Sequence, residues 1–333
     1  MIQSFMKKVQ ARYYDKLPDR RVKCRLCPTE CGIKPGEYGI CTLRKNVDGE
    51  LIAEAYGQLV SLTIDPIEKK PLYHFYPGEP ILSTGPNGCN FKCPFCQNWN
   101  ISQEKAPTEY LSPEKLVSLA GQRGSIGVAF TYTEPLVWYE YVYDCAALLK
   151  EKGLKVVLVS NGYINEEPAR ELFKYVDAVD FDLKSASKEF YKKICKGNLD
   201  DVLRTIKIAH EFNILVELTN LLIPGENDSE EDINKLVDII VGIDSSMPLH
   251  ISRYFPNYKY SLPPTQVSVL QRATEIARRR LAYVYPGNYI NNSDTKCPDC
   301  GRVWIRRDGY FVELPEGKFE KCPDCGRKVD LVW

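Results

Sequence analysis

The sequence predicts an α/β protein built on an incomplete (β/α)6-type TIM barrel. Between residues 75 and 290, short apolar segments alternate with amphipathic segments six or seven times. Such alternation predicts parallel strands joined by right-handed crossovers through helices. A doubly wound open sheet is the competing fold, because it produces the same alternation. Cysteine-rich segments flank this region and divide the chain into residues 1–74, 75–290 and 291–333.

The predicted strands are short runs rich in Val, Ile, Leu and Phe. They are expected at residues 81–84, 127–130, 155–159, 178–183, 214–222, 248–252 and 281–285. The helix expected at 113–122 has Ser112 as a suitable N-cap and Pro113 as a suitable first residue. The other helices are expected at residues 136–152, 166–175, 200–211, 229–241 and 264–280. In such a barrel the chemistry lies at the carboxyl ends of the strands.

The composition is that of a soluble globular protein, with 44% hydrophobic and 26% charged residues. A formal net charge of zero gives no indication of nucleic-acid binding. We expect a cytoplasmic protein with no membrane span, because the sequence shows neither a signal peptide nor an apolar run of about 18 residues. In a reducing compartment, clustered cysteines indicate metal sites. Eleven of the thirteen cysteines form three clusters, whereas Cys145 and Cys195 stand alone and are expected to be structural.

The central cysteine cluster directly follows the first predicted strand. Cys89, Cys93 and Cys96 have the spacing C-x3-C-x2-C, and each can bind one iron of a [4Fe–4S] cluster. No nearby fourth cysteine completes the ligand set, so one iron stays open to a small molecule. S-adenosylmethionine (SAM) can chelate that iron through its amine and carboxylate. A three-cysteine zinc loop with a fourth ligand from elsewhere is the alternative.

This cluster resembles the signature of the radical SAM superfamily, C-x3-C-x-φ-C, with Phe95 as the aromatic residue φ. The resemblance implies a barrel of radical SAM type and an oxidoreductase that cleaves SAM to methionine and a 5′-deoxyadenosyl radical. That radical then abstracts a hydrogen atom from a substrate. The resemblance also implies that Phe95 packs near the adenine of SAM and that a donor such as ferredoxin or flavodoxin supplies the electron.

The resemblance extends to the ends of the later strands. Glu134 takes the place of a segment that binds the amine of SAM, although two glycines of that segment are replaced here; an exposed loop glutamate is the alternative. Asn161 resembles a residue near the ribose, with a plain Asn-Gly turn as the alternative. Ile223 is expected close to the adenine. His250 is expected to contact SAM or the substrate.

Three charged residues lie along the predicted strand at 178–183 and just after it. Side chains alternate along a strand, so Asp180, Asp182 and Lys184 share one face. Because parallel strands are normally buried on both faces, these charges indicate a polar barrel mouth. The segment resembles the Asp-x-Lys segment of pyruvate formate-lyase activating enzyme and its relatives, where it helps to shape the SAM and cation site. A structural salt bridge is the alternative. The candidate catalytic residues are Asp182, Lys184 and His250.

The C-terminal cysteines form two C-x2-C pairs separated by 21 residues. Two such pairs on a hairpin indicate a tetrahedral four-thiolate site, expected to be a zinc ribbon with a rubredoxin-like iron as the alternative. The ligands are expected to be Cys297, Cys300, Cys322 and Cys325.

The N-terminal cysteines form a second set of four. They are Cys24, Cys27, Cys31 and Cys41. Both a structural zinc and a second [4Fe–4S] cluster are consistent with four thiolates. The segments around Cys24–Pro28 and 39–44 resemble the N-terminus of the AmmeMemoRadiSam-system radical SAM enzymes, a subfamily related to pyruvate formate-lyase activating enzyme. That resemblance implies Memo-like or AMMECR-like partners.

Two kinds of enzyme and one non-enzyme remain as functional hypotheses. The first is an activase that abstracts a glycine hydrogen from a partner protein, and the second acts on another substrate, either a small molecule or a protein side chain. The third is a metal-stabilised binding or scaffold protein with a catalytically silent barrel. The third is disfavoured, because the three central cysteines and the charged strand end are all intact.

Overall fold

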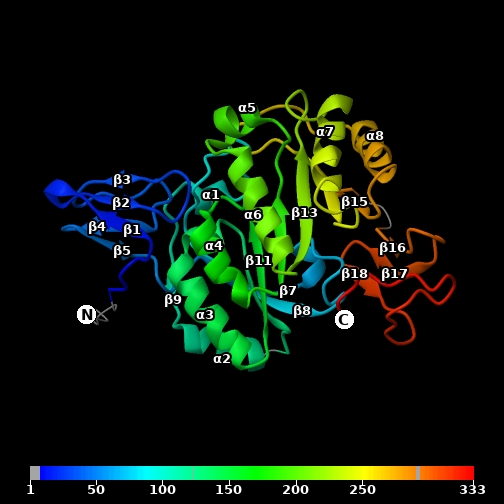
Figure 1. Cartoon of the computed structure of the whole chain (residues 1–333), viewed down its shortest axis with the longest axis horizontal. Coiled ribbons are helices and arrows are strands. Elements are labelled where there is room, and N and C mark those ends of the chain that lie inside the picture. The colour runs from blue at the N-terminus through cyan, green and yellow to red at the C-terminus, as the bar shows by residue number, and fades with distance from the viewer. Residues whose placement is uncertain (1–7, 123, 290–292) are drawn as a thin grey trace.

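The computed structural model describes residues 8–122, 124–289 and 293–333, and an eight-stranded sheet forms its centre (Figure 1). The strand order is β15-β14-β13-β12-β11-β10-β8-β7. Seven of these strands run parallel, and β7 is antiparallel to β8. The bounds of the strands are β7 (Ser61–Pro66), β8 (Pro80–Gly85), β10 (Gly127–Phe130), β11 (Lys155–Ser160), β12 (Ala178–Asp182), β13 (Leu215–Leu222), β14 (Leu249–Arg253) and β15 (Val284–Gly287).

The order of the parallel strands decides between the two competing folds. From β8 to β15 each parallel strand pairs with the next one along the chain. A doubly wound sheet would reverse this order at a switch point, which is absent from the described strands. Because β7 and β15 are the two edges of the sheet, the barrel is incomplete. The predicted fold class is therefore confirmed.

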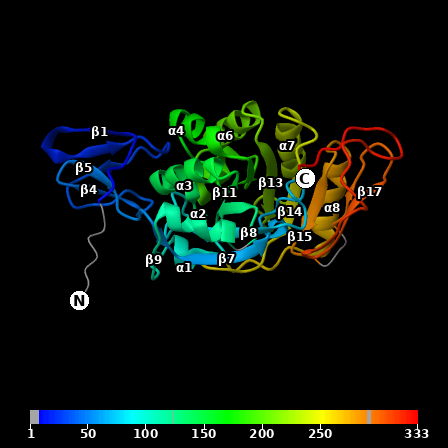
Figure 2. The ribbon, with the colours of Figure 1, turned by 90° about the horizontal axis from the view of Figure 1, so that it is seen from below.

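Helices connect the parallel strands and cover one side of the sheet (Figure 2). The longer helices are α2 (Pro113–Gln122), α3 (Tyr139–Glu151), α4 (Glu166–Leu172), α6 (Leu199–Glu211), α7 (Glu230–Val241) and α8 (Val267–Arg278). Two of them differ from the prediction at their first turn. Residues 135–137 form a separate 3-10 turn before α3, and α8 begins at Val267 rather than at residue 264. Thr265 is held outside α8 because its hydroxyl donates to the carbonyl of Leu222 (2.6 Å).

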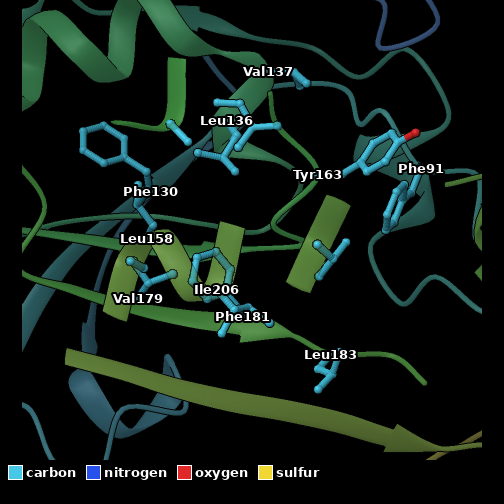
Figure 3. Close-up of a cluster of buried hydrophobic side chains, with 14 of the residues drawn as sticks. Phe91, Phe130, Leu136, Val137, Leu158, Tyr163, Val179, Phe181, Leu183 and Ile206 are labelled. Carbon is cyan, nitrogen blue, oxygen red and sulfur yellow. The ribbon is translucent and has the colours of Figure 1, made fainter. Parts of the chain in front are cut away.

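The two faces of the sheet have different side chains. Phe130, Leu158 and Phe181 point toward the helices and pack with Leu136 and Ile206 in the main core (Figure 3). Burial of this apolar area is the main term that holds the helices on the sheet. The opposite face is lined at its amino end by a smaller apolar cluster, and toward the carboxyl ends of the strands it becomes polar. The smaller cluster comprises Ile67, Leu72, Phe75, Ile81, Ala129, Val157 and Ala178.

The cysteine-rich regions lie on opposite sides of the barrel (Figure 1). The N-terminal region contains β1 (Tyr14–Lys16), β2 (Val22–Cys24), β3 (Gly32–Ile33), β4 (Arg44–Val47) and β5 (Glu50–Ala53). The C-terminal region contains β16 (Thr295–Lys296), β17 (Val303–Asp308) and β18 (Phe311–Glu313).

The edge strand β7 precedes residue 75, where the barrel was expected to begin. It belongs to the central sheet through its pairing with β8. The other expected boundary, at residues 290 and 291, lies outside the described residues. Across the residues that the structure describes, no helix is long and apolar enough to span a bilayer.

Candidate functional site

A cavity of about 440 Å³ opens at the carboxyl ends of the barrel strands. Its walls come from the central cysteine loop and from the ends of β11 to β14. The cavity also reaches the open edge of the barrel, where Lys69, Lys70 and Tyr310 line it. Tyr310 belongs to the C-terminal region, so that region contributes to the wall of the cavity.

The central cysteine loop begins where β8 ends. Gly85 lies against the loop after β10, and a Cβ at this position would come within 2.1 Å of the carbonyl oxygen of Thr131. The chain then turns across the barrel end and enters the short helix α1 (Trp99–Ser102). The hydroxyl of Ser102 lies 3.3 Å from the Sγ of Cys96. The close pairing of β8 and β10 therefore brings the cysteine loop to the cavity wall.

The three central thiols are free and line the cavity together. Burial, with a smaller contribution from Glu134, raises the pKa of Cys89 well above its ordinary value. Burial also raises the pKa of Cys96. Buried thiols of this kind become thiolates when a metal replaces their protons. The donor set therefore suits a thiolate-bound metal centre that faces a cavity.

Cys195 lies beside this centre, and sequence reasoning had set it aside as structural. A hydrogen bond with the Cys195 side chain is the largest cause that raises the pKa of Cys93, followed by burial. The backbone confirms the proximity, because the carbonyl of Cys195 accepts from the N–H of Lys92 (2.9 Å). Nothing in the sequence spacing indicated this contact, because it depends on the π-helical turn Tyr191–Cys195.

The charged residues of β12 and its continuation lie close together in the cavity wall. The ammonium of Lys184 lies 3.1 Å from the carboxylate of Asp182. Burial lowers the pKa of Lys184, but Asp182 and Cys93 outweigh it, so the pKa lies well above its ordinary value. Burial and then Asp182 raise the pKa of Asp180, whose carboxylate accepts from the hydroxyl of Thr219 (2.8 Å). A cation and two carboxyl groups thus line the cavity that contains the thiols.

Phe95 and Asn161 also line the cavity. The side-chain nitrogen of Asn161 lies 3.7 Å from the Sγ of Cys89 and donates to the side-chain oxygen of Asn90 (2.9 Å). The side chain of Asn161 therefore contacts the cysteine loop directly, which a plain Asn-Gly turn would not require.

Glu134 is fully buried and does not lie among the residues that line the cavity. Its carboxylate accepts from the N–H groups of Leu136 (2.9 Å) and Asn161 (2.8 Å) and from the hydroxyl of Ser160 (2.7 Å). Burial nevertheless raises the pKa of Glu134 to about 7. The side chain thus joins the ends of β10 and β11 and holds Asn161 in place. The alternative of an exposed loop glutamate is wrong, because burial is complete.

Ile223 and His250 are not among the residues that line the cavity. Ile223 packs in the main core, and Leu221, two residues earlier, is at the cavity wall. His250 lies deeper in the barrel than Ser252, which does reach the wall. Its Nε2 lies 2.7 Å from the carboxylate of Glu217, a buried partner on the neighbouring strand. Leu221 and Ser252 are the neighbouring residues that reach the cavity wall, and the expected contacts of Ile223 with the adenine and of His250 with SAM or the substrate stay predictions.

The comparison with known proteins agrees with this geometry. Residues 84–237 match the family described as the Radical SAM superfamily. A pyruvate formate-lyase-activating enzyme of Clostridium pasteurianum is 31% identical over 47% of this chain and 67% of its own length. The chain belongs to the radical SAM superfamily. This radical SAM enzyme is also 43% identical to the uncharacterised protein MJ0808 of Methanocaldococcus jannaschii, over 90% of this chain and 91% of that protein.

A solved structure supports the fold of this radical SAM enzyme. The crystal structure of a radical SAM methyltransferase from Sphaerobacter thermophilus matches 65% of this chain and 68% of its own length. The TM-score is 0.51 at 16% sequence identity, so the likeness concerns the fold alone.

The C-terminal cysteines of this radical SAM enzyme form a compact group. The Sγ atoms of Cys297 and Cys325 are 3.5 Å apart, and those of Cys300 and Cys322 are 3.6 Å apart. Four thiolates around one zinc at 2.3 Å would have sulfur atoms about 3.8 Å apart, so the geometry suits a single tetrahedral ion. The two loops are related by a local symmetry. Asp299 of the first pairs with Arg327 (2.8 Å), and Asp324 of the second pairs with Arg302 (2.8 Å).

The N-terminal cysteines of this radical SAM enzyme are free. Cys24, Cys27 and Cys41 are buried, and Cys31 is partly exposed. Burial raises the pKa of Cys27 to about 11 and that of Cys41 to about 12. As at the central set, these thiols need a bound cation to act as thiolates.

Proposed function

We propose that Cys89, Cys93 and Cys96 hold a [4Fe–4S] cluster and that this enzyme cleaves SAM reductively at the cavity. One observation carries the proposal: three free thiols share a cavity with the ammonium of Lys184 and two carboxyl groups. When bound, the cluster supplies one electron that breaks the S–C5′ bond of SAM, which yields methionine and a 5′-deoxyadenosyl radical. The other tasks fall to side chains of this chain.

The methionyl part of SAM carries both an ammonium and a carboxylate. Lys184 offers a cation for the carboxylate, and Asp182 offers an anion for the ammonium. Phe95 provides an apolar surface for the adenine, and Asn161 provides amide groups for the ribose. Glu134 positions Asn161, because its carboxylate accepts a hydrogen bond from the backbone N–H of Asn161 (2.8 Å). In this proposal the Asp182–Lys184 pair opens on SAM binding, which adds a desolvation cost that the new ion pairs offset.

For the substrate, we propose a glycine of a partner protein, from which the radical abstracts a hydrogen atom. The relative from Clostridium pasteurianum, a pyruvate formate-lyase-activating enzyme, supports this class of reaction. We propose a ferredoxin or flavodoxin as the electron donor and Memo-like or AMMECR-like proteins as candidate partners. Electron paramagnetic resonance (EPR) after incubation with each candidate tests the substrate, because a persistent glycyl doublet is expected and its absence with every candidate contradicts an activase.

Incubation of the anaerobically purified protein with SAM and dithionite tests the cleavage itself. We expect 5′-deoxyadenosine from the unaltered protein and none from a Cys93→Ala variant, which also loses the iron of the central site. Cys145→Ala is the matched control, because Cys145 is a buried free cysteine in α3, outside the cavity lining. Its iron content and its yield of 5′-deoxyadenosine should equal those of the unaltered protein. Equal yields from all three proteins would contradict the proposal.

A further inference from the structure

The spacing of the sulfur atoms separates the three cysteine sets into two kinds. Among the described residues, the four C-terminal thiols are the group whose sulfur atoms all lie within 4.8 Å of one another. Neither the N-terminal nor the central set meets that spacing, although all of their cysteines are described. A single ion draws its thiolates together, whereas a cubane carries each thiolate on a separate iron and keeps them farther apart. The N-terminal set is therefore not drawn together as the C-terminal set is, a property that it shares with the central set.

The N-terminal cysteines nevertheless lie close to one another. The N–H of Cys24 donates to the carbonyl of Cys31 (2.9 Å), and a Cβ on Gly39, two residues before Cys41, would lie 3.8 Å from the Sγ of Cys31. They approach from different loops, because Cys24 ends β2, Cys31 precedes β3 and Cys41 precedes β4. The guanidinium of Arg44, which is 1% exposed, donates to the Sγ of Cys24 (3.6 Å). Arg44 also pairs with the buried carboxylate of Glu140, so it fixes the position of the Cys24 thiol rather than supplying an unpaired charge.

The N-terminal set also touches the central cysteine loop. A Cβ on Gly88, the residue before Cys89, would come within 2.3 Å of the carbonyl oxygen of Cys41. The Asn90 side chain lies beside the thiol of Cys27. Asn161 then donates to the oxygen of Asn90 (2.9 Å) and lies 3.7 Å from the Sγ of Cys89. Two amide side chains thus form a continuous path from a thiol of the first set to a thiol of the second.

We infer that Cys24, Cys27, Cys31 and Cys41 hold a second [4Fe–4S] cluster that passes one electron to the central cluster. This inference rests on the proposed function of the central site. A one-electron donor protein, of the iron–sulfur or flavin class, reduces the N-terminal cluster from the 2+ to the 1+ state. That electron then reduces the central cluster, and the N-terminal cluster returns to the 2+ state. Cys31, the partly exposed ligand, marks the side that faces the donor.

Metal analysis of a variant without the central site tests the second cluster. The full-length triple variant Cys89→Ala, Cys93→Ala, Cys96→Ala should retain about four iron and about four sulfide per chain, and the unaltered protein about eight of each. The reduced triple variant should give an EPR signal that SAM does not alter. Zinc in place of iron and sulfide in the triple variant would overturn the inference. If the unaltered protein does not cleave SAM, this result would instead contradict only the proposed function.

The contact between the two sites is tested by their magnetic interaction. In the reciprocal variant Cys31→Ser, Cys41→Ser, about four iron should remain, at the central site. The EPR spectrum of the fully reduced, unaltered protein should be broader than the sum of the spectra of the two variants, because neighbouring unpaired spins interact. A spectrum equal to that sum would overturn the electron path. If the reciprocal variant fails to fold, the power saturation of the EPR signal can be compared between the unaltered protein and the triple variant. Faster spin relaxation is expected in the unaltered protein, because it contains both clusters.

Discussion

At the scale of single residues, Lys184 is the cation beside Asp182 in the cavity. Replacing it with Gln removes the charge that pairs with Asp182 (3.1 Å) and should raise the KM for SAM about tenfold, which corresponds to about 1.4 kcal/mol. Lys188→Gln is the matched control, because its side chain is 72% exposed and its ion pair with Asp200 lies on the surface. The KM of this control should be unchanged. Steady-state formation of 5′-deoxyadenosine measures both values, and a similar KM for the two variants would contradict the role of Lys184.

His74 is a buried group whose titration should affect stability. Burial lowers its pKa below the ordinary 6.5, so the native ring stays neutral while the unfolded chain takes up a proton as the pH falls. Its contribution is therefore present above pH 6.5 and is lost in acid. The Tm of the unaltered protein should fall between about pH 7.5 and about pH 5.5 more steeply than that of His74→Gln. Gln retains the capacity to pair with the carbonyl of Asp330 and the hydroxyl of Tyr285, and equal slopes would refute the prediction.

At the scale of secondary-structure elements, the close contact of β8 with the loop after β10 is a steric constraint. The Gly85→Ala variant would place its Cβ 2.1 Å from the backbone oxygen of Thr131, so the strand end must shift, at a cost of about 1–3 kcal/mol. We expect a lower Tm and less iron at the central site. Gly121→Ala is the control, because open space surrounds that position in α2, and it should leave the Tm unchanged or raise it. Equal Tm values and iron contents for the two variants would contradict the constraint.

Elements with a strong apolar pattern could be predicted from the sequence, and elements fixed by distant partners could not. The runs at 155–159 and 178–183 gave β11 and β12 because buried parallel strands need continuous apolar residues. The edge strand β7 was missed, because Ser61, Thr63 and Asp65 make its pattern mixed. In the site, Cys89 and Asp182, which the cysteine spacing and the period of two along β12 singled out, both line the cavity.

Two features of the site depend on contacts between residues far apart in the sequence. The carboxylate partner of His250, Glu217, lies 33 residues away in the sequence and holds the ring behind the cavity wall. The contact of Cys195 with Cys93 likewise joins residues about a hundred positions apart. Such contacts depend on the packing of whole elements, which local patterns do not specify.

At the scale of the whole molecule, Arg307 joins the C-terminal region to the barrel. It is fully buried, lies 3.6 Å from the carboxylate of Glu68 and donates to the carbonyl of Tyr73 (2.7 Å). Arg307→Met would leave the Glu68 charge buried without this partner and should cost about 3–5 kcal/mol, whereas Arg302→Met, which removes a half-exposed pair with Asp324, should cost about 0–1 kcal/mol. Urea unfolding of the metal-loaded proteins measures both costs, and limited proteolysis should release the C-terminal region sooner from the Arg307 variant. Equal urea midpoints and equal release would mean that the buried pair does not hold the two regions together.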